Sequence, residues 1–220
     1  MLLLYYVLFL FYQFTSLFWQ IDCICREVAI MKCDLCKENG CYNNTECRQN
    51  KKESAVAYEG ENRKIHETAA KIEAEYYMKK TRIEELIIFC REMGYERIGV
   101  AFCIGLKDEA GTLCSYLRNH FSVFSVCCKV CGIPKEELAL QKIEPERFEA
   151  MCNPLAQAEK LEQDRTELNV TVGLCIGHDI LFGKRSHVPV TTLVVKDRVL
   201  SHNPAGALYT GYYKKKLGGK

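Results

Sequence analysis

RIGVAFCIGL, residues 97–106, is the stretch that decides the fold. After Arg97 it is apolar or glycine up to Cys103, and it continues into Ile-Gly-Leu. Three other runs share this short, β-branched and largely apolar character, and they begin at Phe121 (FSVFSVC), Asn169 (NVTVGLC) and Val190 (VTTLVV). Such runs are typical of strands that are covered on both faces of a sheet.

Helical segments lie between these runs, near residues 108–119 and 155–163. Alternating strands and helices predict an α/β fold with a mainly parallel, Rossmann-like sheet and flanking helices. VAFCIGL from Val100 and VGLCIGH from Val172 also align without a gap. We therefore expect two similar βαβ units, in which Leu106 of the first takes the place of His178 in the second.

The region before the sheet, residues 51–93, is rich in Glu, Lys and Ala and contains no proline. Apolar side chains recur at helical spacing from Tyr58 to Tyr76, which predicts one long helix with a single apolar face. A second helix is predicted over residues 81–93, with Gly94 as its stop signal. A small cysteine-rich module precedes both.

The first residues, MLLLYYVLFLFYQFTSLFWQI, carry no charged side chain before Asp22 and are about long enough to span a bilayer. The segment lacks the basic start and the small-residue cleavage site of a signal peptide. Two interpretations stay open: a membrane anchor, or an upstream translation artefact with Met31 as the true start. The predicted organisation is a hydrophobic segment (1–30), a cysteine-rich metal-binding module (31–50), a helical region (51–93), an α/β domain (94–210) and a basic tail (211–220).

Composition limits the class of protein. The chain has 220 residues, 48% of them hydrophobic, and a formal net charge of +2, which gives no electrostatic case for a nucleic-acid partner. Its 14 cysteines are spread over a chain large enough to build a core, unlike a small secreted disulfide scaffold. We therefore expect a reducing cytoplasm, with a membrane partner only if the first thirty residues are genuine; protein partners do not follow from the sequence.

A first sulfur site is predicted at Cys33, Cys36, Cys41 and Cys47, which have the spacing C-x-x-C-x4-C-x5-C. Four thiolates in one short segment can complete a tetrahedron around a metal ion with little chain-closure cost. Zinc and an iron–sulfur cluster both accept such ligands. The spacing does not match the repeated ferredoxin runs, so zinc is the predicted metal and an iron–sulfur cluster is the alternative.

A second site is predicted at the carboxyl edge of the sheet, where open α/β folds bind their ligands. Cys103, Cys128 and Cys175 each come at the end of a strand. The candidate cofactor-binding residues are Cys103, Cys128, Cys152, Cys175 and His178, with Cys127 and Cys131 as further sulfurs nearby. Thiolates at such positions can bind metal or act as nucleophiles, because a helix N-terminus or an imidazole lowers a thiol pKa.

Several motifs with a known chemistry are missing: the sequence contains no Walker A loop, G-x-G-x-x-G, H-E-x-x-H or G-x-S-x-G. Neither a reaction nor a substrate follows from the residues. The prediction is therefore a metal-binding protein with a second Cys/His site, and the alternative is an iron–sulfur or thiol-redox enzyme that uses the second cluster.

The combination of CDLCKENGCY, FSVCCKVCG, MCNPLAQAE, GLCIGHD and VPVTTLVVKDRVLSHNP resembles an uncharacterised cysteine-rich family of bacteria and archaea that is labelled metal-binding or zinc-binding. The resemblance covers roughly residues 32–209 and leaves out the first thirty. It implies a ligand class, zinc or another metal, and no reaction. Cys131 stands where the family pattern leads us to expect glycine.

Overall fold

The computed structural model describes residues 32–44 and 51–219. The predicted anchor or artefact at residues 1–30 and the predicted ligand Cys47 lie outside this part of the chain. The chain divides into two compact units, Met1–Glu59 and Gly60–Lys220. The second unit contains the sheet.

The sheet has four strands, all parallel, in the order β2-β1-β3-β4. They are β1 (Arg97–Phe102), β2 (Ser122–Cys127), β3 (Leu168–Val172) and β4 (Val190–Val194). The predicted α/β class with a parallel sheet is therefore confirmed. The chain leaves β1 toward one side and β3 toward the other, so the strand order reverses between these two central strands, which is where open α/β sheets place their ligands.

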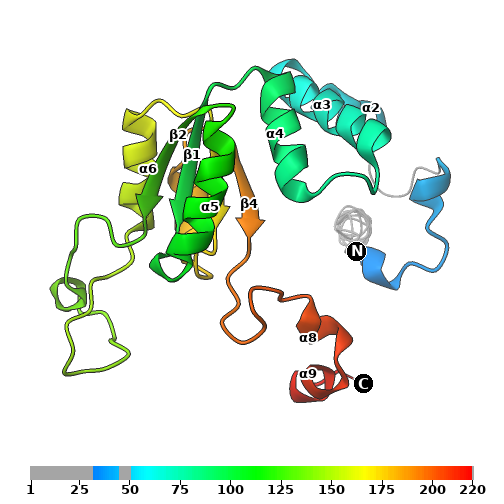
Figure 1. Cartoon of the computed structure of the whole chain (residues 1–220). Coiled ribbons are helices and arrows are strands. Elements are labelled where there is room, and N and C mark those ends of the chain that lie inside the picture. Colours follow the sequence, from blue (N-terminus) through cyan, green and yellow to red (C-terminus); the bar gives the residue numbers. More distant parts are fainter. Residues whose placement is uncertain (1–31, 45–50, 220) are drawn as a thin grey trace, which may run out of the picture. The chain divides into compact units, whose positions relative to one another are not determined.

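Helices follow the strands as a doubly wound sheet requires. Helix α5 (Lys107–Arg118) connects β1 to β2, and α7 (His178–Arg185) connects β3 to β4. Right-handed crossovers that run in opposite directions along the sheet put their helices on opposite faces. Helix α6 (Pro154–Gln163) packs against α7, and Figure 1 shows it beside the strands across from α5.

Coverage of the strands is uneven. Strand β3 is buried at every residue and β1 at its four central residues, whereas β2 and β4 have no fully buried residue. The expectation that all four strands are covered on both faces is thus correct for the central pair only. The outer strands have a neighbour on one side, and the sequence pattern carries no signal for that.

Gly99 in the centre of β1 is required by a buried polar side chain. A Cβ built at Gly99 would lie 2.0 Å from Asn169 Oδ1 on β3. Asn169 is 2% exposed, and its Oδ1 accepts from Thr166 Oγ1 at 2.9 Å while its Nδ2 donates to Ser186 Oγ at 3.0 Å. Both ends of the amide are therefore satisfied, as burial demands, and they tie β3 to the end of α7.

The helical region before the sheet differs from the prediction in one respect. The helix predicted from Tyr58 to Tyr76 begins later, as α3 (Gly60–Tyr76), because Gly60 adopts φ +54°, which does not continue a helix, and a separate short helix α2 (Lys51–Val56) precedes it. Tyr58 lies between the two. Helix α4 (Arg82–Met93) begins with a capping box of Thr81 and Glu84 and ends at Gly94 in the left-handed region, as the sequence predicts.

The remaining elements are short. They are the 3₁₀-helices η1 (Cys33–Leu35), η2 (Gly40–Asn43), η3 (Ile104–Leu106) and η4 (Lys135–Leu138), and the helices α8 (Gly206–Tyr209) and α9 (Gly211–Lys216). Within the described ranges, no helix combines the length and the apolar character needed to cross a membrane.

Candidate functional site

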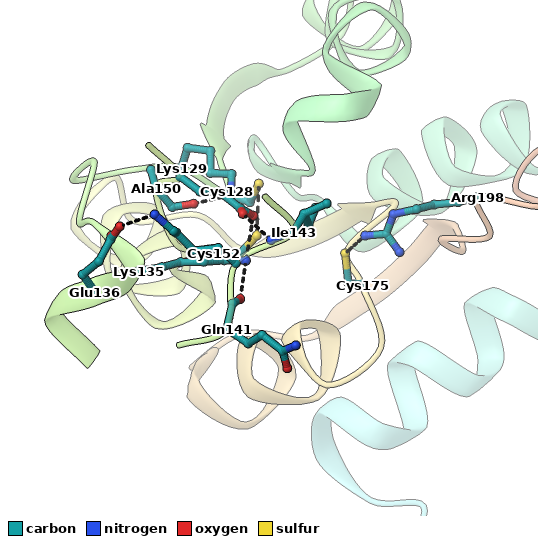
Figure 2. A network of polar contacts seen from close by, with 12 residues as sticks. Cys128, Lys129, Lys135, Glu136, Gln141, Ile143, Ala150, Cys152, Cys175 and Arg198 are labelled. Atoms are coloured by element: carbon teal, nitrogen blue, oxygen red, sulfur yellow. Dashed lines mark hydrogen bonds and ion pairs between the residues drawn. The ribbon is translucent and has the colours of Figure 1, made fainter. Parts of the chain in front are cut away.

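Three cysteines from distant parts of the chain meet at the carboxyl edge of the sheet. Cys103 follows β1, Cys128 follows β2, and Cys152 comes two residues before α6. The Sγ atoms of Cys128 and Cys152 are 3.9 Å apart, and the Ile104 amide donates to Cys128 Sγ at 3.3 Å. Figure 2 shows the two sulfurs facing each other. We call Cys103, Cys128 and Cys152 the sulfur cluster.

The backbone brings these residues together. Phe102 and Cys127 are partners in the parallel register, and the Cys128 amide donates to the Phe102 carbonyl at 2.8 Å, so Cys103 and Cys128 leave neighbouring strands side by side. The Asn153 amide donates to the Cys128 carbonyl at 2.8 Å, which holds the third segment against the second.

Buried Gln157 on α6 fixes the same edge from the side of the helix. Its Nε2 donates to the carbonyls of Phe102 (3.2 Å) and Val126 (2.7 Å), one on each of two neighbouring strands. The start of α6 is set by Asn153, whose side chain accepts from the Ala156 amide, and by Pro154 in the first turn. Cys152 is thus placed by a well-defined helix start.

The three thiols have different acidities. The pKa of Cys152 is lowered to about 5, first by the hydrogen bond from Cys128 and then by the neighbouring Lys129 and His178. The pKa of Cys103 is also lowered to about 5, by the hydrogen bond from Cys128, the Gly105 amide and Lys196. The pKa of Cys128 is raised, because its thiol hydrogen-bonds to either Cys103 or Cys152 and is buried. A thiol carries one proton, so Cys128 donates to one thiolate at a time.

A cavity of about 980 Å³ opens over this edge. Cys103 and Cys152 line it, while Cys128 lies beneath them and is 3% exposed. The other polar side chains of the lining are Lys129, Lys135, Gln141, Glu144, Arg147, Glu149, Cys175, His178, Lys196 and Arg198. The space suits a small organic molecule.

Each cysteine that lines the cavity has a cation beside it. Arg198 Nη2 donates to Cys175 Sγ at 2.9 Å. Lys196 acts on Cys103, and Lys129 and His178 act on Cys152. Positive charge favours the thiolate over the thiol. Figure 2 shows the Cys175–Arg198 pair at a different place along the edge from the Cys128–Cys152 pair.

The N-terminal ends of helices add to the positive charge beside these cysteines. Cys103 immediately precedes η3 and stands four residues before α5, Cys152 stands two residues before α6, and Cys175 stands three residues before α7. The N-terminal end of a helix carries a partial positive charge and unpaired amides, and both stabilise a nearby anion. The topology therefore places Cys103 and Cys152 where thiolates are favoured.

The predicted second-site residues thus lie along one edge, although they do not form one contact group. Cys103, Cys152, Cys175 and His178 line the cavity, and Cys128 lies below it. The His178 amide donates to the Cys175 carbonyl at 2.9 Å, while His178 is among the groups that lower the pKa of Cys152.

The neighbouring cysteines Cys127 and Cys131 have other environments. Cys131 is exposed, adopts φ +72° and is absent from the lining, so of this C-x-x-C pair only Cys128 belongs to the sulfur cluster. Cys127 is half-buried against the core.

The opening cysteines have a different setting. Cys33, Cys36 and Cys41 are exposed on or beside η1 and η2, and Cys47 lies outside the described residues. In residues 32–44 and 51–219, no group of three or more His, Cys, Asp or Glu side chains is arranged to hold a metal ion. The described cysteines are all free thiols.

Sequence reasoning missed the roles of Lys129 and Arg198. Lys129 follows the Cys127-Cys128 pair directly, and Arg198 lies four residues after β4. Their positions just past strand ends are the signal that could have found them. Asp197 and His202, by contrast, build the loop itself: Asp197 Oδ1 accepts from the amides of Val199 (2.9 Å) and Leu200 (2.8 Å), and His202 Nδ1 contacts the Asp197 amide.

Comparison with known proteins identifies a family but no activity and no ligand. A family described as "Protein of unknown function (DUF1847)" matches residues 41–193, and the chain belongs to this family. An uncharacterised protein of Methanocaldococcus jannaschii is 56% identical over 189 residues, which cover 85% of this chain and 98% of that protein. No solved structure matches the chain.

Proposed function

We propose that the sheet edge is a thiol–disulfide exchange site in which Cys152 is the nucleophile, Cys128 the resolving thiol and Cys103 the base. The observation that supports this most is the contact between a cavity-lining sulfur of low pKa, Cys152, and a buried thiol of raised pKa, Cys128, whose Sγ atoms are 3.9 Å apart. Thiol–disulfide exchange needs an accessible thiolate to attack first and a second sulfur within reach.

The first step consumes a disulfide, R–S–S–R. The Cys152 thiolate attacks one sulfur, the S–S bond breaks, and one RS⁻ leaves while a mixed disulfide forms on Cys152. In the second step Cys128 attacks Cys152 Sγ and releases the second RS⁻. Its proton passes to the Cys103 thiolate, to which it is hydrogen-bonded. The substrate disulfide is reduced to two thiolates, and Cys128 and Cys152 are oxidised to one disulfide.

The environment of Cys128 changes in the course of these steps. In the reduced site two neighbouring thiolates keep its proton on, which prevents it from competing with Cys152. Once Cys152 is in the mixed disulfide, one of these negative charges is gone. The Ile104 amide, 3.3 Å from Cys128 Sγ, then stabilises the thiolate that must form there.

Cys152 is preferred to Cys103 as nucleophile because of access. Both sulfurs have a lowered pKa, but Cys103 is buried, with 7% of its surface exposed, whereas Cys152 is half-buried. Cys103 is therefore suited to receive a proton, and Cys152 to meet a substrate sulfur.

The test is a trapping experiment with hydroxyethyl disulfide. In the Cys128→Ser variant we expect the mixed disulfide to accumulate on Cys152, because nothing resolves it; the unchanged chain should form the Cys128–Cys152 disulfide. Peptide mapping by mass spectrometry reads both products, and circular dichroism checks that the variant folds. Cys131→Ser, at an exposed cysteine outside the cavity, is the matched control and should behave as the unchanged chain.

The proposal fails if the trapped adduct maps to another cysteine. It also fails if the unchanged chain, treated with excess disulfide, contains no bond between Cys128 and Cys152.

A second candidate function is metal binding, with zinc as the ion and an iron–sulfur cluster as the alternative. It is favoured by the spacing of Cys33, Cys36, Cys41 and Cys47 in the sequence. The arrangement of the described residues does not itself fit a metal ion, since they hold no suitable group and Cys47 is outside them. No step of the exchange reaction involves a metal.

Metal analysis of anaerobically purified protein, started from Met31, tests this second function. One equivalent of zinc in a colourless protein would support the zinc site, and a visible charge-transfer absorption bleached by reductant would support the cluster. Less than one equivalent of any transition metal would exclude both. Either function needs reduced thiols, so we propose the reducing cytoplasm as the compartment.

A further inference from the structure

The cavity over the sulfur cluster has an uneven balance of charge. Five lysine and arginine side chains line it, against two glutamates. Both glutamates already have a partner: Glu149 forms an ion pair with Lys135 at 2.6 Å, and Glu144 lies 3.8 Å from Arg147. The remaining lining cations are Lys129, Lys196 and Arg198.

In the part of the chain that the structure describes, none of these three cations forms an ion pair with a carboxylate, although the charge of Lys129 helps to lower the pKa of Glu149. Lys129 donates to the Ala150 carbonyl, and Arg198 donates to Cys175 Sγ at 2.9 Å. Lys196 acts on the sulfur of Cys103. A cation that faces a cavity without a carboxylate is available to an anionic ligand.

The loop after β4 prevents its own carboxylate from neutralising them. Asp197 stands between Lys196 and Arg198, but its Oδ1 accepts from the amides of Val199 and Leu200, at 2.9 and 2.8 Å. The carboxylate is therefore committed to the turn, and Asp197 is not part of the lining, whereas both flanking cations are. Asp197 therefore leaves Lys196 and Arg198 free to act on the cavity that Cys152 also lines.

We propose that this cavity takes an anionic disulfide, whose carboxylate or other oxyanion group is held by Lys196 and Arg198 while its S–S bond faces Cys152. The inference rests on the proposed exchange function and adds the substrate class to it. Charge also favours it during the reaction: the mixed disulfide removes the negative charge of Cys152 from the cavity, and the substrate anion replaces it.

Two matched alkylating agents test the anion subsite without any disulfide chemistry. Iodoacetate carries a carboxylate and iodoacetamide does not, and both alkylate thiolates. The ratio of their rate constants at Cys152, divided by the same ratio for N-acetylcysteine, measures the attraction for an anion. We expect a normalised ratio of about ten at low salt, in the range by which a charged cleft raises association rates, with a fall at high salt.

The variants Lys196→Gln and Arg198→Gln should each lower the normalised ratio, and the double variant should bring it close to one. Lys184→Gln removes the same charge from an exposed position on α7 outside the cavity and should leave the ratio as it is. A ratio near one in the unchanged chain, or a raised ratio that survives in the double variant, would overturn the proposal.

Disulfides then test the substrate class. The expected order of rates at Cys152 is dithiodipropionate, a dianion, before neutral hydroxyethyl disulfide and cationic cystamine. If hydroxyethyl disulfide reacts as well as dithiodipropionate, the anionic substrate class is wrong and the exchange function stands. If none of the three reacts at Cys152, the exchange function is wrong, and the alkylation ratio alone decides whether an anion subsite exists.

Discussion

Two groups of cysteines in this chain look alike in composition and differ in their surroundings. Cys33, Cys36 and Cys41 are close in sequence and exposed. Cys103, Cys128 and Cys152 are each separated by more than twenty residues, yet they meet at one edge of the sheet with cations and helix starts beside them. The difference teaches that closely spaced cysteines in a sequence predict a set of metal ligands. A shifted thiol pKa, in contrast, requires neighbouring groups that only the folded chain brings together.

The strongest test of the difference between the two groups of cysteines is which group binds a metal ion. If the opening cysteines hold zinc, Cys36→Ser should remove the whole equivalent, because three protein ligands of a structural site bind far more weakly than four. Cys152→Ser should leave the metal in place. Metal content by elemental analysis after anaerobic purification measures both. The reverse result would assign the metal to the sheet edge and would contradict the separation of the two groups.

The pH dependence of alkylation tests the tuning of Cys152. With a pKa of about 5, Cys152 is almost wholly thiolate from pH 8 down to pH 6, so its rate with iodoacetamide should change by less than a factor of two. The rate of a thiol with the ordinary pKa of ~8.5 falls roughly 75-fold over the same range. Peptide mapping gives the rate at Cys152, with N-acetylcysteine as reference. A parallel fall at both thiols would show that Cys152 is not tuned.

The dependence of the sulfur cluster on the core is tested at Gly99. An added Cβ would lie 2.0 Å from Asn169 Oδ1, so Gly99→Ala should lower the free energy of unfolding by about 1–3 kcal/mol, as overpacking of a core does. Cys131→Ser, at an exposed position outside the cavity, should change it by less than about 0.5 kcal/mol. Denaturant titration followed by circular dichroism measures both. Equal changes in the free energy of unfolding would mean that the centre of β1 does not support the sheet edge as described.

Loss of one cation should have the smallest effect. Lys129→Gln removes one of the charges that lower the pKa of Cys152, while the hydrogen bond from Cys128, which is the largest cause, remains. The midpoint of the pH–rate curve of Cys152 should therefore rise, and the alkylation rate at pH 5 should fall roughly threefold, as expected for a minor charge contribution. Lys184→Gln on α7 is the control. An unchanged midpoint would show that Lys129 does not lower the pKa of Cys152.

Much of the fold could be predicted from the sequence, because the spacing of apolar residues and the local composition are properties of neighbouring residues. The runs from Arg97, Phe121, Asn169 and Val190 became the four strands, and Gly94 ended α4 as predicted. The break at Gly60 was missed, because a single glycine inside a helical pattern does not by itself announce a positive φ. Partial exposure of the outer strands was missed as well, since strand order is not a local property.

The sequence by itself determined the parallel α/β class, because a run of β-branched residues is a pattern of neighbouring residues. It also determined which cysteines follow the strands, and the ends of parallel strands meet at the carboxyl edge of the sheet. Only the tertiary structure decided which sulfurs touch. Cys128 meets Cys152 from the start of α6 instead of Cys131 three residues away, and Lys129, Lys196 and Arg198 reach the same cavity. The physical reason is that contacts and pKa values depend on distances across the sheet, which strand order sets and local spacing does not.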